Sequence, residues 1–386
     1  MGPFYDFDTV VDRRGTGCEK WGKYRGRDII PMWVADMDFR SPPAVIEALR
    51  QRTEHGIFGY TDASPELVDT VVGMLGRDFG WQVDPEWLVW LPGLVCGLNV
   101  TCRAVGVEGD DVLTLVPVYP PFLSAPRHAR RGLVRVPLRE DSNRWSIDFD
   151  RLKAALTARS RLFMLCNPHN PVGRVFDRSE MEALAEWCLG AGVTVCADEI
   201  HCGLVLDPGR RHIPFASLGH EVAERTITLM SPSKTFNLAG LGCSFAIIPA
   251  EPLRRSFLQA KAGIVPMINP FGYLAAQVAY RDCEDWRLAL VSYLRRNRDV
   301  LVEALLGMPG GLSMAPVEGT YLAWIDIRQA GLDEPVHFFE EAGVGLQDGR
   351  EFDGAGFVRL NFGCPRSVLG EALGRMKRGL ERRSRC

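Results

Sequence analysis

The stretch Thr226–Lys234 reads Thr-Ile-Thr-Leu-Met-Ser-Pro-Ser-Lys and joins an apolar, β-branched run directly to a small polar loop. A short run of this composition is typical of a strand that is buried on both faces, as in a mainly parallel sheet. We therefore expect Thr226–Met230 to form a central strand whose carboxyl end carries Ser231 and Lys234.

Similar runs lie on both sides of this stretch, and amphipathic helical segments separate them. One segment begins with Ser179-Glu180-Met181-Glu182, which matches a capping box led by the Ser179 hydroxyl, and it ends near Gly192. Alternating strands and helices predict an α/β fold with right-handed crossovers. The other expected strands are Val112–Val116, Leu133–Pro137, Leu162–Cys166, Val193–Ala197 and Ser244–Ile248.

A chain of 386 residues is long for one hydrophobic core, so we expect two lobes. The predicted large domain covers residues 46–279, and a smaller α+β domain combines residues 1–45 with residues 280–386. The smaller domain should hold a long helix at Trp286–Leu305 and strands at Thr320–Ile327 and Phe357–Asn361. The amino-terminal segment, up to about Ser41, has no partner of its own in sequence and is expected to pack on that lobe.

Composition limits the function classes. The formal net charge is −3, and the one basic block, Arg375–Arg385, is read as a solvated helix end, so no nucleic-acid partner is expected. No uncharged apolar run reaches about 18 residues, and the amino terminus has no apolar signal region, so we expect neither a membrane span nor secretion.

An odd count of eleven cysteines favours free thiols in a reducing cytoplasm. No CxxC pair supports a zinc site, and no metal is expected.

Polar and aromatic side chains follow four of the expected strands. Tyr119, Asn170, Asp198 and the pair Ser231 and Lys234 each come shortly after a strand ends. In open α/β sheets, ligands bind beyond the carboxyl ends of the strands. One aromatic ring, one amide, one carboxylate, one hydroxyl and one amine are the groups that an aromatic phosphorylated aldehyde needs for stacking, hydrogen bonding and imine formation.

Three motifs carry a resemblance to a known family. Ser231–Gly240 looks like the SxSKxxxxxG signature of class I and II aminotransferases, and Asn170–Gly173 (Asn-Pro-x-Gly) and Asp198-Glu199 occur at the right intervals upstream. A narrower resemblance covers nearly the whole chain and is similar to the cystathionine β-lyase-like carbon–sulfur lyases of the MalY/PatB type. It rests on the segments Met32–Phe39, Gly56–Thr61, Pro117–Phe122, Asp198–His201 and Arg359–Phe362.

The resemblance implies fold type I, with a mainly parallel seven-stranded sheet in the large domain, and a homodimer with active sites at the subunit interface. It also implies pyridoxal 5'-phosphate bound to Lys234 as a Schiff base and a small amino-acid substrate. Transferred by position, Lys234 also moves the Cα proton, and Tyr119 stacks on the ring and takes part in catalysis. The implied binding roles are Asp198 at the pyridine nitrogen, Asn170 and His201 near the ring oxygen, Ser231 and the amides of Gly93, Leu94 and Val95 at the phosphate, Tyr60 of the neighbouring subunit at the same phosphate, and Arg359 at the substrate carboxylate.

Simpler interpretations of these residues stay open. Tyr119 could be a rigid turn aromatic before two prolines, Asp198 a helix cap and Arg359 a structural ion-pair partner. Tyr60 could be an ordinary surface aromatic, and His201 could fill the core.

Two departures bear on the reaction. Gly242 stands where aminotransferases usually carry a phosphate-binding arginine, and His201 stands where they usually place a tyrosine. Both departures match the lyases, so the expected reaction is α,β-elimination of cystathionine or another cysteine S-conjugate to thiol, pyruvate and ammonia.

Transamination and an oxidative decarboxylation–deamination of an S-cysteinyl compound remain alternatives. A non-enzymatic regulator is the least favoured: the chain has no room for an added DNA-reading domain, which leaves only a regulator that acts by protein contact as an open alternative. Within the lyase group, Gly203 and Asp353 also depart from the common pattern and point to a substrate other than cystathionine.

Overall fold

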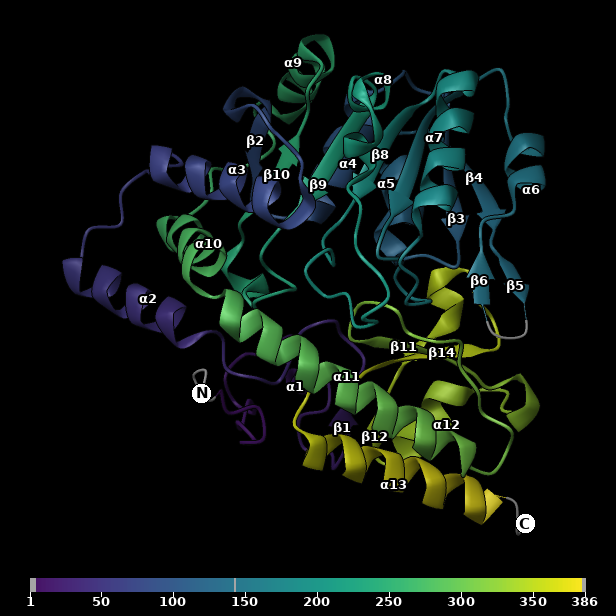
Figure 1. Cartoon of the computed structure of the whole chain (residues 1–386). Helices are drawn as coiled ribbons and strands as arrows, with labels where there is room; N and C mark the ends of the chain where they lie inside the picture. The colour runs from purple at the N-terminus through teal and green to yellow at the C-terminus, as the bar shows by residue number, and fades with distance from the viewer. Residues whose placement is uncertain (1–4, 142–143, 384–386) are drawn as a thin grey trace.

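A seven-stranded sheet forms the centre of the upper lobe in Figure 1. The computed structural model describes residues 5–141 and 144–383. The strand order is β2-β10-β9-β8-β7-β3-β4, and every neighbouring pair is parallel except the two pairs made by β10. The mainly parallel sheet predicted from sequence is therefore confirmed. Its strands are β2 (Leu88–Leu91), β3 (Asp111–Val116), β4 (Gly132–Pro137), β7 (Ser160–Cys166), β8 (Thr194–Asp198), β9 (Thr226–Met230) and β10 (Ser244–Ile247).

Helices cover both faces of this sheet, which explains why its strands are continuously apolar. Phe163 and Leu165 of β7 pack into the cluster that contains α7 (Arg178–Ala191). Leu162 and Met164 point to the opposite face. That face is covered by α4 (Leu94–Ala104), α5 (Pro120–His128) and α9 (Glu251–Lys261).

The capping box of α7 lies two residues earlier than the sequence suggested. Asp177, not Ser179, caps the helix: its carboxylate accepts from the Glu180 amide at 3.0 Å, and the Glu180 carboxylate accepts from the Asp177 amide at 3.0 Å. The Ser179 hydroxyl instead donates to Asp177 at 2.6 Å. A carboxylate can accept both bonds at once, whereas a hydroxyl in the same place would offer weaker acceptance. The helix end at Gly192, with φ of 67°, is as predicted.

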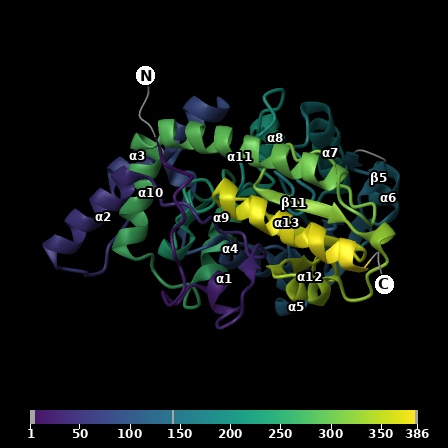
Figure 2. The same cartoon turned by 90° about the horizontal axis from the view of Figure 1, so that it is seen from below.

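The lower lobe is built on a three-stranded antiparallel sheet of order β11-β14-β13. Figure 2 shows α11 and α13 lying beside each other against this lobe. The basic carboxy-terminal stretch belongs to α13 up to Arg383, and the rest of it lies outside the described residues. The elements are β11 (Leu322–Asp326), β13 (Gln347–Asp348), β14 (Phe357–Asn361), α11 (Glu284–Leu306), α12 (Pro335–Glu341) and α13 (Arg366–Arg383).

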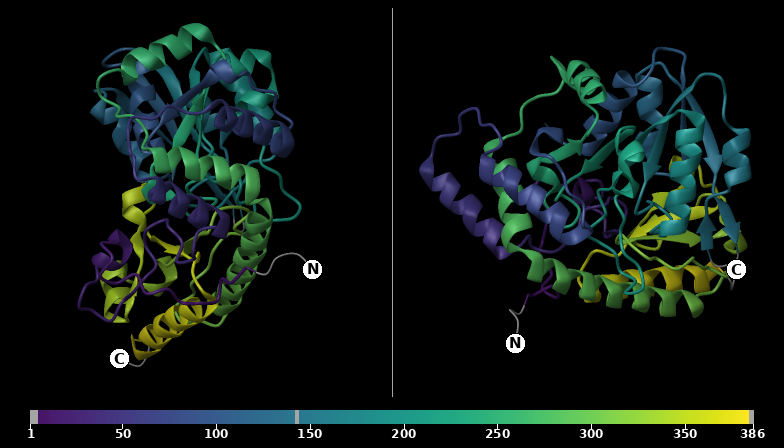
Figure 3. Two further views of the ribbon diagram at one scale, coloured as in Figure 1. Left: turned by 90° about the vertical axis from the view of Figure 1, so that its left-hand side faces the viewer. Right: turned by 45° about the horizontal axis from the view of Figure 1, so that its top comes forward.

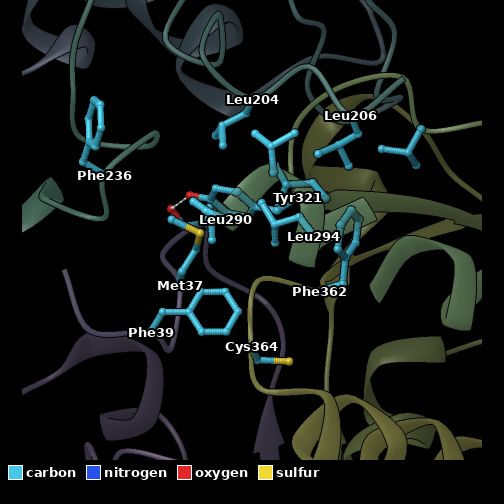
Figure 4. Packing of buried hydrophobic residues seen from close by; sticks show 14 of the residues in the cluster. Met37, Phe39, Leu204, Leu206, Phe236, Leu290, Leu294, Tyr321, Phe362 and Cys364 are labelled. Carbon is cyan, nitrogen blue, oxygen red and sulfur yellow. Dashed lines mark hydrogen bonds between the residues drawn. The ribbon is translucent and has the colours of Figure 1, made fainter. Parts of the chain in front are cut away.

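The amino-terminal segment packs on this lower lobe, as expected (Figure 3, left). Strand β1 (Ile30–Pro31) pairs in parallel with β12 (Val344–Gly345). Further along the segment, Met37 and Phe39 lie in one buried cluster with Tyr321, which directly precedes β11, and with residues of α11 (Figure 4).

The remaining helices include α10, which contacts α2 and α3 and contributes buried residues to the core. The predicted domain boundaries stay a prediction; they fall inside α2 and α10. Among the described residues, no helix is long and apolar enough to cross a membrane. The elements are α1 (Glu19–Gly22), α2 (Pro43–His55), α3 (Pro65–Phe79), α6 (Phe149–Ala154), α8 (His220–Ala223), α10 (Pro270–Asp282), β5 (Arg139–Asp141) and β6 (Arg144–Ser146).

Candidate active site

A cavity of about 220 Å³ lies at the carboxyl ends of the central strands. β7 ends at Cys166 and β8 at Asp198, while Ser231 directly follows β9, so the chain order places these side chains on one rim. Most of the residues expected from sequence line this one cavity: Gly93, Leu94, Val95, Tyr119, Asn170, Asp198, His201, Ser231 and Lys234.

Lys234 is the amine of the cavity. Its Nζ donates a 2.7 Å hydrogen bond to the carbonyl oxygen of Ala35, and the Tyr321 hydroxyl donates to the same oxygen at 2.9 Å. Burial lowers the pKa of Lys234 from its usual 10.5 to about 8, with the positive charge of Arg359 acting in the same direction. The amine is therefore partly neutral near physiological pH, which is the form that attacks a carbonyl.

Asp198 is a carboxylate without a cationic hydrogen-bond partner in the part of the chain that the structure describes. Its side chain is 4% exposed, and burial raises its pKa to about 7, opposed mainly by the hydrogen bond that Oδ1 accepts from the Ile200 amide at 3.1 Å. No helix begins within residues 199–214, so this bond closes a turn and the helix-cap interpretation is wrong; the side chain also lines the cavity. A buried acid in this state is stabilised by a ligand that brings a positive N–H group.

His201 presents a neutral imidazole to the cavity. Burial lowers its pKa to about 3, and the charges of Lys234 and Arg359 lower it further. Its Nδ1 has no hydrogen-bond partner among the described residues. The ring therefore acts as a neutral hydrogen-bonding group here, not as a cation.

The far end of the cavity suits a phosphate group. Helix α4 begins at Leu94 with Gly93 as its cap, so its first amides point outward without partners in the helix. The Ser231 hydroxyl donates to the Cys243 carbonyl at 2.8 Å and accepts from the Ser233 amide at 3.1 Å. Ser231 is thus held at this wall of the cavity.

Gly242, also in this wall, has a left-handed backbone with φ of 61°. A Cβ at this position would lie 3.2 Å from the Pro92 carbonyl oxygen. This left-handed backbone favours glycine and would strain an arginine, consistent with the absence of the usual phosphate-binding arginine.

Arg359 lies behind the cavity wall and does not line the cavity itself. It is 2% exposed, and Nη1 donates to Asn170 Oδ1 at 2.9 Å while Nη2 donates to the Trp33 carbonyl at 3.0 Å and to Gln347 Oε1. Its Nε has no partner among the described residues. All these acceptors are neutral, so within the described chain Arg359 is not a member of a structural ion pair.

Tyr60 is the one expected site residue that stands apart from the others. It lies in the loop between α2 and α3 and is 97% exposed. Within a single chain it reaches neither the cavity nor any of its lining residues.

Two further departures have local explanations. Asp353 has φ of 65°, a conformation that glycine adopts freely and aspartate tolerates better than most residues, and its carboxylate pairs with Arg135 at 3.4 Å. At Gly203, an added Cβ would come within 2.7 Å of Thr235 Oγ1, directly after Lys234. Glycine at 203 therefore lets the loop that carries His201 approach the lysine loop.

Three residues that contact the site were missed from sequence; among them, only Ala35 lines the cavity. Ala35 acts through its carbonyl oxygen, and Tyr321 and Gln347 act from the other end of the chain. The sequence signal that could have identified Ala35 is its position within Met32–Phe39, one of the segments that carry the family resemblance. A residue that contributes a backbone atom leaves no pattern of its own.

The residues present fit pyridoxal 5'-phosphate. Within residues 5–141 and 144–383, no cation bonds to Asp198, which a protonated pyridine nitrogen would supply. The start of α4 offers free amides to a phosphate, and Lys234 offers a partly neutral amine to an aldehyde. The three groups line one cavity.

Comparisons with known proteins agree with this geometry. Residues 27–376 match the family described as aminotransferase class I and II. Cystathionine beta-lyase PatB of Bacillus subtilis is 39% identical over 97% of this chain and all of the relative. The crystal structure of OvoB superposes with a TM-score of 0.95 at 45% identity, covering 97% of this chain and 99% of that one.

A PLP-bound C–S lyase from Staphylococcus hominis gives a TM-score of 0.91 at 33% identity, covering 98% of this chain and 99% of that one. The chain belongs to the class I and II aminotransferase family of fold type I pyridoxal-phosphate enzymes, and within it to the carbon–sulfur lyases of the MalY/PatB type.

Proposed function

We propose that this enzyme cleaves the Cβ–S bond of cysteine S-conjugates by α,β-elimination and releases a thiol, pyruvate and ammonia. The proposal is carried by one observation: Lys234 and Asp198 line a single cavity, and the unpaired guanidinium of Arg359 is one hydrogen bond behind its wall at Asn170. That arrangement suits an α-amino acid whose amine and carboxylate are held at opposite ends. The full-length similarity to a cystathionine beta-lyase and to a C–S lyase supports a sulfur leaving group.

Pyridoxal phosphate, when bound, supplies an electron sink for the charge left on Cα. Asp198 would keep the pyridine nitrogen protonated, and the Asn170 amide nitrogen would donate to the ring oxygen. Tyr119 would stack on the ring. The amides of Gly93–Val95 and the Ser231 hydroxyl would hold the phosphate.

Lys234 would move the proton at Cα. Its lowered pKa lets the amine exist in the neutral form that accepts a proton near pH 8. The Ala35 carbonyl gives this amine a fixed resting position 2.7 Å away. Arg359 would bind the substrate carboxylate through the N–H groups that its neutral partners leave open, at Nε and Nη1, with a planar charge that lysine cannot reproduce.

Two residues of the cavity favour elimination over transamination: Gly242, beside the proposed phosphate site, and His201. Gly242 stands where aminotransferases usually place an arginine, on a left-handed backbone that favours glycine, and His201 is a neutral imidazole where they usually place a tyrosine. Both differences bring this site closer to the lyase pattern.

A homodimer with shared active sites forms part of the proposal. Tyr60 is almost fully exposed, and its loop also exposes Ile57 (66%) and Phe58 (54%). Exposed apolar groups of this size are typical of a surface that another protein covers. In a two-fold dimer, Tyr60 would reach the phosphate end of the neighbouring cavity.

We place the enzyme in the cytoplasm. The ten cysteines that the structure describes are all free, and most are buried. Buried free thiols fit a reducing compartment.

The test is a product assay with purified holoenzyme and L-cystathionine or a simple cysteine S-conjugate. Thiol, pyruvate and ammonia should appear in equal amounts without an added 2-oxo acid. A need for a 2-oxo acid, with conversion of the cofactor to its pyridoxamine form, would show a transaminase. Carbon dioxide and an aldehyde formed with oxygen consumption would show the oxidative reaction.

A further inference from the structure

The charge of Arg359 is buried and surrounded by neutral acceptors. Three oxygens contact its guanidinium, from the Asn170 side chain, the Trp33 backbone and the Gln347 side chain. Burial lowers the pKa of Arg359 to about 10, and Glu351 is among the groups that oppose this shift. A buried cation without a bound anion is costly, so this site is ready to accept an external carboxylate.

Of the three contacts with Arg359, the one made by Gln347 is fixed by strand pairing. It lies directly opposite Arg359 in the antiparallel pair of β13 and β14. Side chains of such a pair lie on the same face of the sheet, close enough to bond. Gln347 Oε1 therefore meets Nη2 because of strand register, without help from a flexible loop.

The Gln347 amide is held in one orientation by a second contact. Its Nε2 donates to Glu351 Oε2 at 2.9 Å. With the nitrogen turned to Glu351, the oxygen must face Arg359. The uncharged Gln347 amide therefore lies between the Glu351 carboxylate and the Arg359 guanidinium.

We propose that Gln347 is a positioning residue that holds Arg359 in place without neutralising it, and that this neutrality keeps the guanidinium available to the substrate α-carboxylate. The inference rests on the proposed role of Arg359. A carboxylate at position 347 would pair with Arg359 internally and compete with the substrate. Charge at this position, more than loss of a contact, should therefore damage substrate capture.

Two variants separate charge from shape. Gln347→Glu keeps the length and the acceptor oxygen but adds a negative charge, whereas Gln347→Met keeps the length, removes the acceptor oxygen and adds no charge. Gln347 is half-buried at the lobe surface, so both chains should fold. Gln329→Glu, on an exposed turn of the same lobe, is the matched control for an added charge.

The measured quantity is the Kd of a small probe for the holoenzyme, obtained from the change in absorbance of the bound cofactor. The probes are 3-(methylsulfanyl)propanoate, which has a carboxylate and no amine, and 2-(methylsulfanyl)ethylamine, which has an amine and no carboxylate. For the carboxylate probe, we expect Kd to rise about tenfold or more in Gln347→Glu and about threefold in Gln347→Met, because charge-assisted bonds are roughly twice as strong as neutral ones. For the amine probe, neither variant should change binding.

Other outcomes overturn the inference. Carboxylate binding that is as tight in Gln347→Glu as in the unaltered enzyme, or weaker in Gln347→Met than in Gln347→Glu, would show that neutrality is not what Gln347 supplies. An equal loss for both probes would reduce Gln347 to a general structural role. Arg359→Ala separates this from the proposed function: if that variant still binds the carboxylate probe normally, the assignment of Arg359 fails first.

Discussion

The side-chain oxygen of Asn170 accepts a 2.9 Å hydrogen bond from Nη1 of Arg359. The bond ties a residue in the cavity wall to the buried guanidinium behind it. It also fixes the Asn170 amide so that its nitrogen is free to donate toward the cavity. The proposed cofactor contact and the proposed substrate contact are therefore mechanically linked.

Asn170→Asp should impair substrate capture more than Asn170→Ala. The aspartate would pair with Arg359 and would also lose the donor to the cofactor ring, whereas alanine only removes the contact. We expect KM to rise about tenfold more in Asn170→Asp, a difference of about 1.4 kcal/mol. Steady-state kinetics with a cysteine S-conjugate measure this, and equal KM values in the two variants would contradict the link.

The ligand-free protein should lose stability as pH rises from about 4 to 7, because the buried Asp198 has a pKa of about 7. In that window the folded protein binds a proton that the unfolded chain has released, so the free energy of unfolding falls with pH. Asp198→Asn removes this cost and should stabilise the ligand-free protein above pH 7 by up to about 4 kcal/mol, with no gain below pH 4.

Denaturant unfolding of both proteins at several pH values checks this expectation. Bound cofactor should flatten the pH dependence of the unaltered protein, since the ring nitrogen would pair with the carboxylate. In the holoenzyme, Asp198→Asn should instead lower turnover strongly. A pH profile that is the same for both ligand-free proteins would mean that Asp198 ionises normally.

Cofactor capture by the ligand-free protein should speed up with pH around a midpoint of about 8, not 10.5, because the neutral Lys234 amine is the attacking group. Stopped-flow absorbance after mixing with pyridoxal phosphate measures the rate. Borohydride reduction should then fix the cofactor on Lys234, as peptide mapping can show. Lys234→Ala should give no reduced adduct, and the exposed-lysine control Lys153→Ala should behave normally.

Mixing two inactive variants should restore activity if active sites are shared. In a dimer of one Tyr60→Ala chain and one Lys234→Ala chain, one cavity has Lys234 from its own chain and an intact Tyr60 from its neighbour. Random subunit exchange should then recover about a quarter of the unaltered activity. Lack of recovery after exchange, verified by mass-tagged chains, would argue against the role of Tyr60.

Much of the sheet was predictable because its strands are buried on both faces. Thr226–Met230 was predicted with the bounds that the structure has, and the other five expected strands of the large sheet differ by one or two residues. In the lower lobe, Phe357–Asn361 also has the predicted bounds. Strand β2 was missed, since Leu88–Leu91 is only four residues long, is half-exposed and precedes a proline. Its antiparallel pairing with β10 is a tertiary contact that leaves no local pattern.

The site was predictable to the extent that strand ends reveal it. Asp198, Ser231 and Lys234 follow strands, and their meeting follows from parallel topology. Tyr321 and Gln347 lacked such a signal, because their contacts with Ala35 and Arg359 depend on how the lower lobe is paired. The α7 cap was misplaced because Asp177 and Ser179 stand close together and both suit the position; only the side-chain geometry chooses between them.

The parallel pairing of β1 with β12 brings Ile30 beside Val344. The wall that holds Lys234 and Arg359 is therefore completed by residues from both ends of the chain, at Ala35, Trp33 and Gln347. During synthesis on the ribosome, the nascent chain cannot close this wall until its last lobe has emerged. The residues that line the cavity lie between Ala35 and Cys243, so a chain that stopped before β13 and β14 would carry the cofactor residues but would lack the guanidinium proposed to bind the substrate carboxylate.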